Sequence, residues 1–346
     1  MSSGNPDAFG LGIDAGGTAT RWALADPSGR VLAQGSVAGL TALLMGSEAG
    51  RGQMAVTLRQ LAGEVDTACS SVGSGQGAGG SVQRVLAGFT GYSEDAPLRA
   101  RLEALIAAAL GLPAGRVLAL GDIALAYLDC FAPGAGYLVY AGTGSIAAYI
   151  DPQGRLHRAG GRGSLLDDGG GGYWIAREAM RHIWRAEDEL PGSWHGSPMA
   201  VAVFGQLGGS EWARSRDFFY QGARGKVGEL AVTVAAAAVQ GDAVALALLR
   251  QAGVELARLA LALARRFGPR PLALSGGAVR LHPAIEAGMR DALRDAAGSA
   301  PDAAPTLRVA ALRAHETAAR LAARDDPLLH RFTDVERERG SRTPGT

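Results

Sequence analysis

The sequence has only two cysteines, Cys69 and Cys130, and they form no CxxC pair. A disulfide framework is therefore not expected, and this cysteine content suits a reducing cytoplasm. The six histidines show no metal-ligand spacing. A GxxxxGK[ST] motif is also absent, because Gly225-Lys226 is followed by Val227. These absences exclude a disulfide scaffold and a P-loop nucleotide-binding protein.

An excess of charge of one sign is also lacking. The formal net charge is +1 over 346 residues, and no basic block or aromatic-basic stripe occurs. This pattern argues against a nucleic-acid-binding face. No apolar run is long enough to span a membrane, since the Ala-rich stretch after Glu229 is interrupted at residues 240–242. The N-terminus resembles no signal peptide. We therefore expect a cytoplasmic protein that binds neither nucleic acid nor membrane.

An internal repeat is the most informative feature that the sequence does contain. Residues 17–30 read GTATRWALADPSGR, and residues 142–155 read GTGSIAAYIDPQGR. The two segments align without a gap at a constant offset of 125 residues. A repeat of this length indicates an internal duplication.

Each copy predicts the same local structure. A short apolar run (residues 9–14 and 136–141) precedes a glycine-threonine turn, and a second β-prone run leads to an Asp-Pro turn and a third strand. Backbone N–H groups in such a glycine turn suit a phosphate, and hydroxyl groups add further donors. Two such turns facing each other would hold one triphosphate from both sides. The candidate ATP-binding residues here are Gly16, Gly17, Thr18, Thr20, Gly142, Thr143 and Gly144.

The two copies differ at one position that bears on metal binding. Asp14 precedes the first turn, where the second copy has Val139. A carboxylate beside a phosphate turn repels the phosphate unless a cation lies between them, so Asp14 is a candidate Mg²⁺ ligand. The alternative is an aspartate that only caps its own turn, and we favour the metal role because the end of this strand is otherwise apolar.

Three other segments carry candidate functional residues. Asp122 ends an apolar strand (residues 116–121) and begins a helical pattern, so it is either an N-cap or a group used in catalysis. Residues 160–172 form a glycine loop with Arg162, Asp167 and Asp168. Ionised carboxylates accept hydrogen bonds from sugar hydroxyls, whereas a solvated loop with an N-cap is the alternative. Gly276 and Gly277 follow a further apolar strand, where a nucleotide could lie against the backbone.

Together these segments resemble the actin-like ATPase fold and, more narrowly, the N-acetylglucosamine kinases and the BadF/BcrA-type ATPases. The resemblance covers roughly residues 9–325 and rests on DAGGTATRW, LGD at 120–122, AGTGSIAAYID, GGRGSLLDDGGGGYWIA and LALSGG. It implies an α/β fold of two actin-like (ribonuclease H-like) lobes related by duplication. The expected division is residues 1–128 for the N-terminal lobe, 129–328 for the C-terminal lobe, and 329–346 for a charged, frayed tail. The last helix is expected to pack back on the N-terminal lobe.

The resemblance also implies an activity and a role for each matching residue. Asp122 would be the general base that takes the proton from the 6-hydroxyl of an amino sugar, with Mg²⁺ and ATP as cofactors. Thr18 and Thr143 would contact the ATP phosphates, and Gly276 would lie at the nucleotide. N-acetylglucosamine is the expected substrate, glucosamine the alternative, and a homodimer the expected assembly. The sugar-contact positions are Thr41, Ser145, Ile146, Gly161, Arg162, Gly163 and Asp168.

The chain departs from the family pattern at three places near the expected sugar. Thr41 stands where the family often has Asn, and Arg162 where it often has Trp. Residues 167–171 read DDGGG where the family often has GDEGS. These departures leave the identity of the sugar open, and a charged Arg162 could favour an anionic or differently substituted sugar.

Two activities of other classes are alternatives to a sugar kinase. Activator ATPases of 2-hydroxyacyl-CoA dehydratases share the ATPase turns but hold an iron–sulfur cluster through cysteines in set loops. Here Cys69 and Cys130 are each expected within a helix. A non-catalytic sugar sensor would need a degraded site, whereas Asp14, Asp122 and both turns are present.

Overall fold

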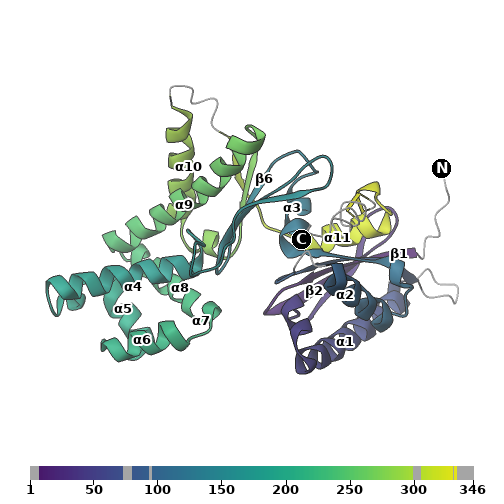
Figure 1. Ribbon diagram of the computed structural model, residues 1–346, viewed down its shortest axis with the longest axis horizontal. Helices are drawn as coiled ribbons and strands as arrows, with labels where there is room; N and C mark the ends of the chain where they lie inside the picture. The colour runs from purple at the N-terminus through teal and green to yellow at the C-terminus, as the bar shows by residue number, and fades with distance from the viewer. Residues whose placement is uncertain (1–7, 73–79, 93–95, 299–304, 330, 333–346) are drawn as a thin grey trace, which may run out of the picture. The chain divides into compact units, whose positions relative to one another are not determined.

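The computed structural model describes residues 8–72, 80–92, 96–298, 305–329 and 331–332. The chain divides into two compact units. The first comprises Met1–Gly134, Ile150–Leu156 and Leu312–Thr346, and the second comprises Ala135–Tyr149 and His157–Ala311. Each unit contains a five-stranded sheet (Figure 1). The lobe boundary expected between residues 128 and 129 stays a prediction. Of the expected tail, the described residues include Leu329 and Phe332, which are both buried.

The sheet of the first unit has the strand order β3-β2-β1-β4-β5. Strands β1 and β2 are antiparallel, as are β2 and β3, while β4 runs parallel to β1 and β5 runs parallel to β4. The carboxyl ends of β1, β4 and β5 therefore lie at the same edge. The strands are β1 (Ala8–Ala15), β2 (Ala19–Ala25), β3 (Val31–Ala38), β4 (Ser81–Phe89) and β5 (Val117–Gly121).

Helices cover both faces of this sheet (Figure 1). Helices α1 (Glu48–Val72) and α2 (Ala96–Ala109) pack on one face. The side chains of Leu11 and Ile13 on β1 form one apolar core with those of the two helices. The sequence predicts that Asp95 and Pro97 open α2, and Asp95 lies outside the described residues. Helix α11 (Ala314–Ala323) packs on the opposite face. A Cβ atom added to Gly12 there would lie 2.0 Å from the His315 carbonyl oxygen, so only glycine permits this approach.

Helix α3 (Asp122–Cys130) follows β5 directly and holds α11 in place. The Asp129 carboxylate accepts hydrogen bonds from the Arg313 backbone N–H, at 2.7 Å, and from the Thr317 hydroxyl. Because these groups belong to the first turn of α11, Asp129 satisfies part of its free N-terminus. Two short 3₁₀ helices, η1 (Ala42–Gly46) and η2 (Ala114–Arg116), complete the described elements of this unit.

The sheet of the second unit repeats the strand order of the first, as β10-β9-β6-β7-β8. Strands β6 and β7 are antiparallel, while β9 runs parallel to β6 and β10 to β9. The two Asp-Pro turns also agree: the Gly29 N–H donates to the Asp26 carbonyl at 2.8 Å, and the Gly154 N–H to the Asp151 carbonyl at 2.9 Å. The strands are β6 (Tyr137–Ala141), β7 (Ser145–Ile150), β8 (Leu156–Gly160), β9 (Leu272–Ser275) and β10 (Leu307–Val309).

The second unit carries most of the helices in the described chain. The longest, α9, begins after an Asp242 N-cap whose carboxylate accepts hydrogen bonds from the Val244 and Ala245 N–H groups at 3.0 and 2.9 Å. No helix among the described residues is long and apolar enough to cross a membrane. The helices are α4 (Gly172–Glu189), η3 (Ser193–Gly196), α5 (Pro198–Leu207), α6 (Trp212–Gln221), α7 (Arg224–Gly228), α8 (Leu230–Val239), α9 (Ala243–Phe267), η4 (Ala278–Leu281) and α10 (Pro283–Ala297).

Candidate functional site

The first glycine-threonine turn joins β1 to β2. The Gly16 N–H donates to the Ala19 carbonyl at 3.1 Å, and Gly17 and Thr18 are exposed at its tip. Thr20 differs, since it is fully buried and its Oγ1 accepts a hydrogen bond from the Leu40 N–H at 3.0 Å. The structure therefore gives the Thr20 hydroxyl a contact within the unit, and its contact with phosphate stays a prediction.

Two acidic residues lie at the carboxyl edge of the first sheet. Asp14 is the penultimate residue of β1, and Asp122 is the first residue of α3, directly after β5. Strand β4 lies between them, where Gly88 pairs in register with Asp14. A Cβ atom on Gly88 would lie 2.8 Å from Leu125 Cδ2 and 3.4 Å from the Asp122 Cα, so the missing side chain allows α3 to pack closely on β4.

The geometry at Asp122 bears on the two roles left open for it. Gly121, not Asp122, occupies the N-cap position of α3. Asp122 Oδ1 accepts a hydrogen bond from the Ile123 N–H at 2.8 Å, and the carboxylate lies in the first turn of the helix. Negative charge is favoured there by the helix dipole. Asp122 is therefore not the N-cap, and its catalytic role stays a prediction.

The electrostatic surroundings of Asp14 favour a cation. Burial raises the pKa of the Asp14 carboxyl, the negative charges of Asp122 and Asp129 raise it further, and Arg21 opposes them. The described residues contain no group of three or more His, Cys, Asp or Glu side chains that could enclose a metal ion. Asp14 thus fits Mg²⁺ held through a single carboxylate, since Mg²⁺ keeps several waters and binds substrate phosphates.

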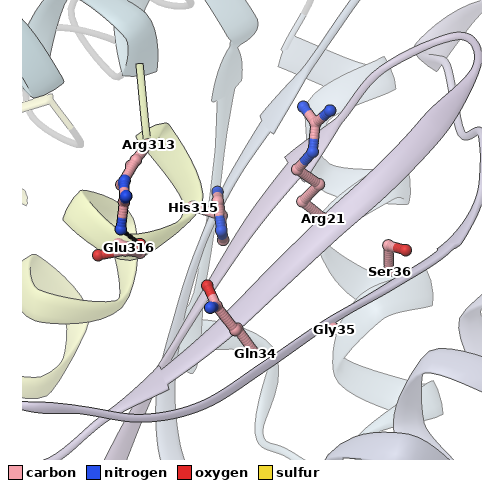
Figure 2. A pocket seen from close by; sticks show the side chains of 7 residues that line it. All are labelled: Arg21, Gln34, Gly35, Ser36, Arg313, His315 and Glu316. Atoms are coloured by element: carbon pink, nitrogen blue, oxygen red, sulfur yellow. Dashed lines mark hydrogen bonds and ion pairs between the residues drawn. The ribbon is translucent and has the colours of Figure 1, made fainter. Parts of the chain in front are cut away.

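A pocket of about 420 Å³ is lined in part by Arg21 of β2 (Figure 2). Arg21 pairs in register with Asp14 across β1 and β2 and makes no hydrogen bond or ion pair with any described residue. By contrast, the Glu316 carboxylate is bound by Arg313 at 3.1 Å and by Arg320 at 2.8 Å. The pocket therefore places an uncommitted guanidinium beside the predicted metal ligand. Its lining residues are Arg21, Gln34, Gly35, Ser36, Arg313, His315 and Glu316.

In the second unit, the second glycine-threonine turn is tied to the start of α4. The Gly172 N–H donates to the Gly142 carbonyl at 2.8 Å, and the Tyr173 N–H donates to the Thr143 carbonyl at 2.9 Å. Ser145 is buried, and its hydroxyl donates to the Gly169 carbonyl at 2.6 Å. The structure therefore brings this turn, the glycine loop and α4 together.

Helix α9 supports the glycine loop through charged side chains that the sequence did not single out. Arg258 donates to Asp167 Oδ1 at 2.8 Å and to Glu255 Oε2 at 3.0 Å. A Cβ atom on Gly169 would lie only 2.9 Å from Glu255 Oε2. The residues at 167 and 169 that depart from the family pattern therefore have a local explanation: Asp167 pairs with α9, and a glutamate from α9 fills the space beside Gly169.

Asp168 has the least ordinary environment in the loop. Its backbone lies in the left-handed region, with φ of 58°, and its residue is 3% exposed. Its Oδ2 atom is buried and has no hydrogen-bond partner within the described residues. The nearest cation is Arg224, whose Nη2 lies 3.7 Å from Oδ2. Strained backbone and an unpaired buried acceptor are both features found at functional sites.

The remaining predicted sugar contacts divide between the two units. In the second unit, Arg162 lies between Gly161 and Gly163, is exposed, and has no ion pair with a described residue. A Cβ atom on Gly161 would lie 2.8 Å from Ile146 Cδ1, so loop and strand are in close contact. In the first unit, Thr41 is half-buried at the start of η1, and its Cγ2 lies 3.8 Å from the position of a Cβ on Gly17.

Gly276 lies at the end of β9, beside the end of β6. Its φ is 113°, and a Cβ atom would lie 2.1 Å from the Ala141 carbonyl oxygen. Glycine is therefore required for packing at this point, whether or not a nucleotide lies there. Gly277 is exposed at the start of η4, and nucleotide binding by both residues stays a prediction.

Both cysteines lie in helices, as the sequence predicts. Cys69 is buried in α1, where burial raises the pKa of its thiol to about 11, and Cys130 is the last residue of α3. Neither cysteine therefore lies in a loop of the kind expected to hold an iron–sulfur cluster.

Comparison with solved structures supports the fold. A Chromobacterium violaceum protein, provisionally described as an N-acetylglucosamine kinase, is similar with a TM-score of 0.66 at 25% identity, over 92% of this chain and 100% of that chain. A Porphyromonas gingivalis protein with the same provisional description has a TM-score of 0.65 at 16% identity, over 92% of this chain and 99% of that chain. These similarities confirm the predicted α/β fold with two actin-like lobes.

A curated relative matches over a much shorter segment. The N-acetyl-D-glucosamine kinase of Dictyostelium discoideum is 38% identical over 55 residues, which is 16% of this chain and 17% of that protein. The match thus spans less than a fifth of the length of that relative.

The sequence profile of the BadF/BadG/BcrA/BcrD ATPase family matches residues 11–304. The matched range contains Asp14, Asp122, both glycine-threonine turns and the glycine loop. Since it covers most of the chain, the chain belongs to the BadF/BadG/BcrA/BcrD ATPase family.

Proposed function

We propose that this protein is an ATP-dependent kinase that phosphorylates the 6-hydroxyl of an amino sugar, with N-acetylglucosamine as the substrate. The observation that carries the proposal is the placement of Asp14 and Asp122 at one sheet edge, beside an exposed glycine-threonine turn. One carboxylate there would serve the metal and the other the acceptor hydroxyl, the two acidic functions that phosphoryl transfer to an alcohol uses.

In the first unit, each of these groups has a distinct task. The Asp122 carboxylate would accept the proton of the attacking hydroxyl. Asp14 would hold Mg²⁺, which when bound neutralises charge on the phosphates. The Gly17 and Thr18 backbone and the Thr18 hydroxyl would orient the phosphates by hydrogen bonds. Arg21, beside Asp14 in register, adds positive charge at the same edge.

In the second unit, the turn at Thr143 would contact phosphate, and the glycine loop would contact the sugar. The unpaired Oδ2 of Asp168 is an acceptor suited to a sugar hydroxyl. The choice of N-acetylglucosamine is supported by the descriptions of the Chromobacterium violaceum protein and of the Dictyostelium discoideum relative. Arg162 remains available for a substituent of the sugar, since it is exposed and has no ion pair with the described residues.

The test is ADP release by the purified protein with Mg-ATP and a panel of sugars. The panel comprises N-acetylglucosamine, glucosamine, N-acetylmannosamine, N-acetylmuramic acid and glucose. We expect N-acetylglucosamine to stimulate ADP release, and Asp122→Asn to abolish the stimulation. Asp66→Asn is the matched control, because Asp66 is an exposed aspartate on α1. Release that no sugar raises above the rate with ATP alone contradicts the proposal.

The same preparation tests the main alternative. An activator ATPase would be brown, contain iron and hydrolyse ATP without a sugar. We expect a colourless protein, because Cys69 and Cys130 both lie in helices and not in loops. The homodimer and the cytoplasmic location also stay predictions, and sedimentation equilibrium would determine the assembly.

A further inference from the structure

Asp168 combines three features that are costly in a folded protein. It is an acidic residue that is 3% exposed, its backbone has a positive φ, and its Oδ2 has no hydrogen-bond partner among the described residues. A buried carboxylate without compensation is strongly unfavourable in its charged form. A positive charge nearby would offset this cost.

Arg224 is placed to do this. It is the first residue of α7, and its Nη2 lies 3.7 Å from Asp168 Oδ2, which is an ion-pair distance but too long for a hydrogen bond. The same Nη2 lies 3.0 Å from the position of a Cβ on Gly144. The guanidinium therefore lies at the second glycine-threonine turn, beside the carboxylate.

The helix that carries Arg224 is itself seated on this turn. Val227 of α7 is fully buried, and a Cβ on Gly228 would lie 3.1 Å from Thr143 Cγ2. A movement of the turn would thus be transmitted to α7, and a movement of α7 to the guanidinium. Packing of Val227 and Gly228 thus positions the backbone of α7, from which the half-exposed Arg224 side chain reaches Asp168.

A second ion pair in the same loop shows that the Asp168 pair is different in kind. Arg258 closes on the neighbouring Asp167 at 2.8 Å, a normal charge-assisted hydrogen bond. Arg224 and Asp168 stay 0.9 Å further apart, at 3.7 Å. The first pair fastens the loop to α9, whereas the second places a positive charge near Oδ2 without a hydrogen bond to it.

We propose that Arg224 is a positioning residue for the sugar: its charge compensates the buried Asp168 carboxylate at the second turn and so holds that carboxylate in place to accept a hydrogen bond from a substrate hydroxyl. This rests on the proposed kinase function and adds to it a residue that determines sugar affinity. Because Arg224 acts through Asp168, the two residues form one functional unit, and their effects on sugar binding are not additive.

A double-mutant cycle tests this coupling. We expect Arg224→Gln to raise the KM for N-acetylglucosamine about tenfold and to leave the KM for ATP unchanged. The reason is that the variant removes one partner of a partly buried charge pair. Arg224→Lys should restore most of the affinity. In the Asp168→Asn background, Arg224→Gln should have no further effect, since the charge to be compensated is gone. Asn also accommodates a positive φ, which makes this background a conservative one.

Arg216→Gln is the matched control. Arg216 is 54% exposed and pairs with Asp217 at 3.2 Å, but Asp217 is itself 52% exposed. Loss of this solvated pair should leave both KM values unchanged. An equal effect of Arg224→Gln in both backgrounds, or an effect on the KM for ATP alone, overturns the proposal.

Thermal unfolding of the wild type, Arg224→Gln, Asp168→Asn and the double variant separates this inference from the proposed function. Arg224→Gln should lower Tm in the presence of Asp168 and leave Tm unchanged in the Asp168→Asn background. If the wild-type protein shows no sugar-dependent ADP release, the kinase proposal fails while this cycle still tests the charge compensation. Additive Tm changes across the cycle contradict the inference whether or not the protein is a kinase.

Discussion

Gly88 offers a direct test of how the fold positions Asp122. A Cβ atom on Gly88 would lie 2.8 Å from Leu125 Cδ2, 3.0 Å from Leu125 Cβ and 3.4 Å from Asp122 Cα. Carbon atoms in contact are about 3.5–4.0 Å apart. In a Gly88→Ala variant, α3 must therefore move away from β4 by roughly 1 Å, because Leu125 is fully buried and has little room to yield.

The size of the effect follows from this displacement. Overpacking of a well-packed core costs about 1–3 kcal/mol of unfolding free energy, and each kcal/mol corresponds to roughly 2–4 °C in Tm for a domain of this size. A displacement of about 1 Å of a catalytic group lowers the rate by about 100-fold. We therefore expect a modestly destabilised protein with a much lower kcat.

The assay combines sugar-dependent ADP release with thermal unfolding of the same preparation. Gly115→Ala is the matched control, because no atom lies within 4 Å of the added Cβ on this residue of η2, and it should change neither quantity. A Gly88→Ala variant with a lower Tm but a kcat within about twofold of the wild-type value would show that the position of α3 does not set the rate.

Three other substitutions give distinct outcomes. Because the pKa of Asp14 is raised, its stabilising contribution is present below about pH 3.8 and is lost as pH rises through its folded pKa. Asp14→Asn should therefore abolish Mg²⁺-dependent activity yet raise the unfolding free energy at pH 7, by about 1.4 kcal/mol for each pKa unit that separates the folded from the unfolded chain. Equal stability of the variant and the wild type at pH 7 contradicts this. Thr20→Val leaves the Leu40 N–H without its acceptor and should cost about 1–3 kcal/mol in urea unfolding, while Thr20→Ser should not. Arg258→Met releases Asp167 from α9 and should raise the sugar KM about two- to fivefold with the ATP KM unchanged, a small effect because Arg258 is half exposed; a larger effect on ATP would show that the loop serves the nucleotide.

Much of the fold could be predicted because the sequence repeats itself. The segments around Asp26 and Asp151 form turns with matching hydrogen bonds, since a short-range Asp-Pro-x-Gly pattern determines them locally. The order of strands in the second sheet then mirrors that of the first. The junction at Asp122 was also predicted, because an apolar strand that runs into a helical period shows in a single segment of sequence.

Other elements escaped prediction for physical reasons. Strand β10 is only three residues long, too short for an alternating pattern to be recognised. Helix α8 is rich in alanine and valine on all sides, so no helical period stands out. The contact between Arg258 and Asp167 joins residues 91 positions apart. Likewise, the approach of Arg224 to Asp168 depends on how α7 packs and has no signature in the local sequence.

Transfer of the γ-phosphate of ATP to a sugar hydroxyl is the step that defines the proposed function. The most direct test is incubation with ATP labelled in the γ-phosphate, with N-acetylglucosamine or its 6-deoxy analogue as acceptor. We expect the label to move to N-acetylglucosamine, none to move to the 6-deoxy analogue, and Asp122→Asn to stop the transfer. Label released as inorganic phosphate at the same rate with and without the sugar would contradict this expectation.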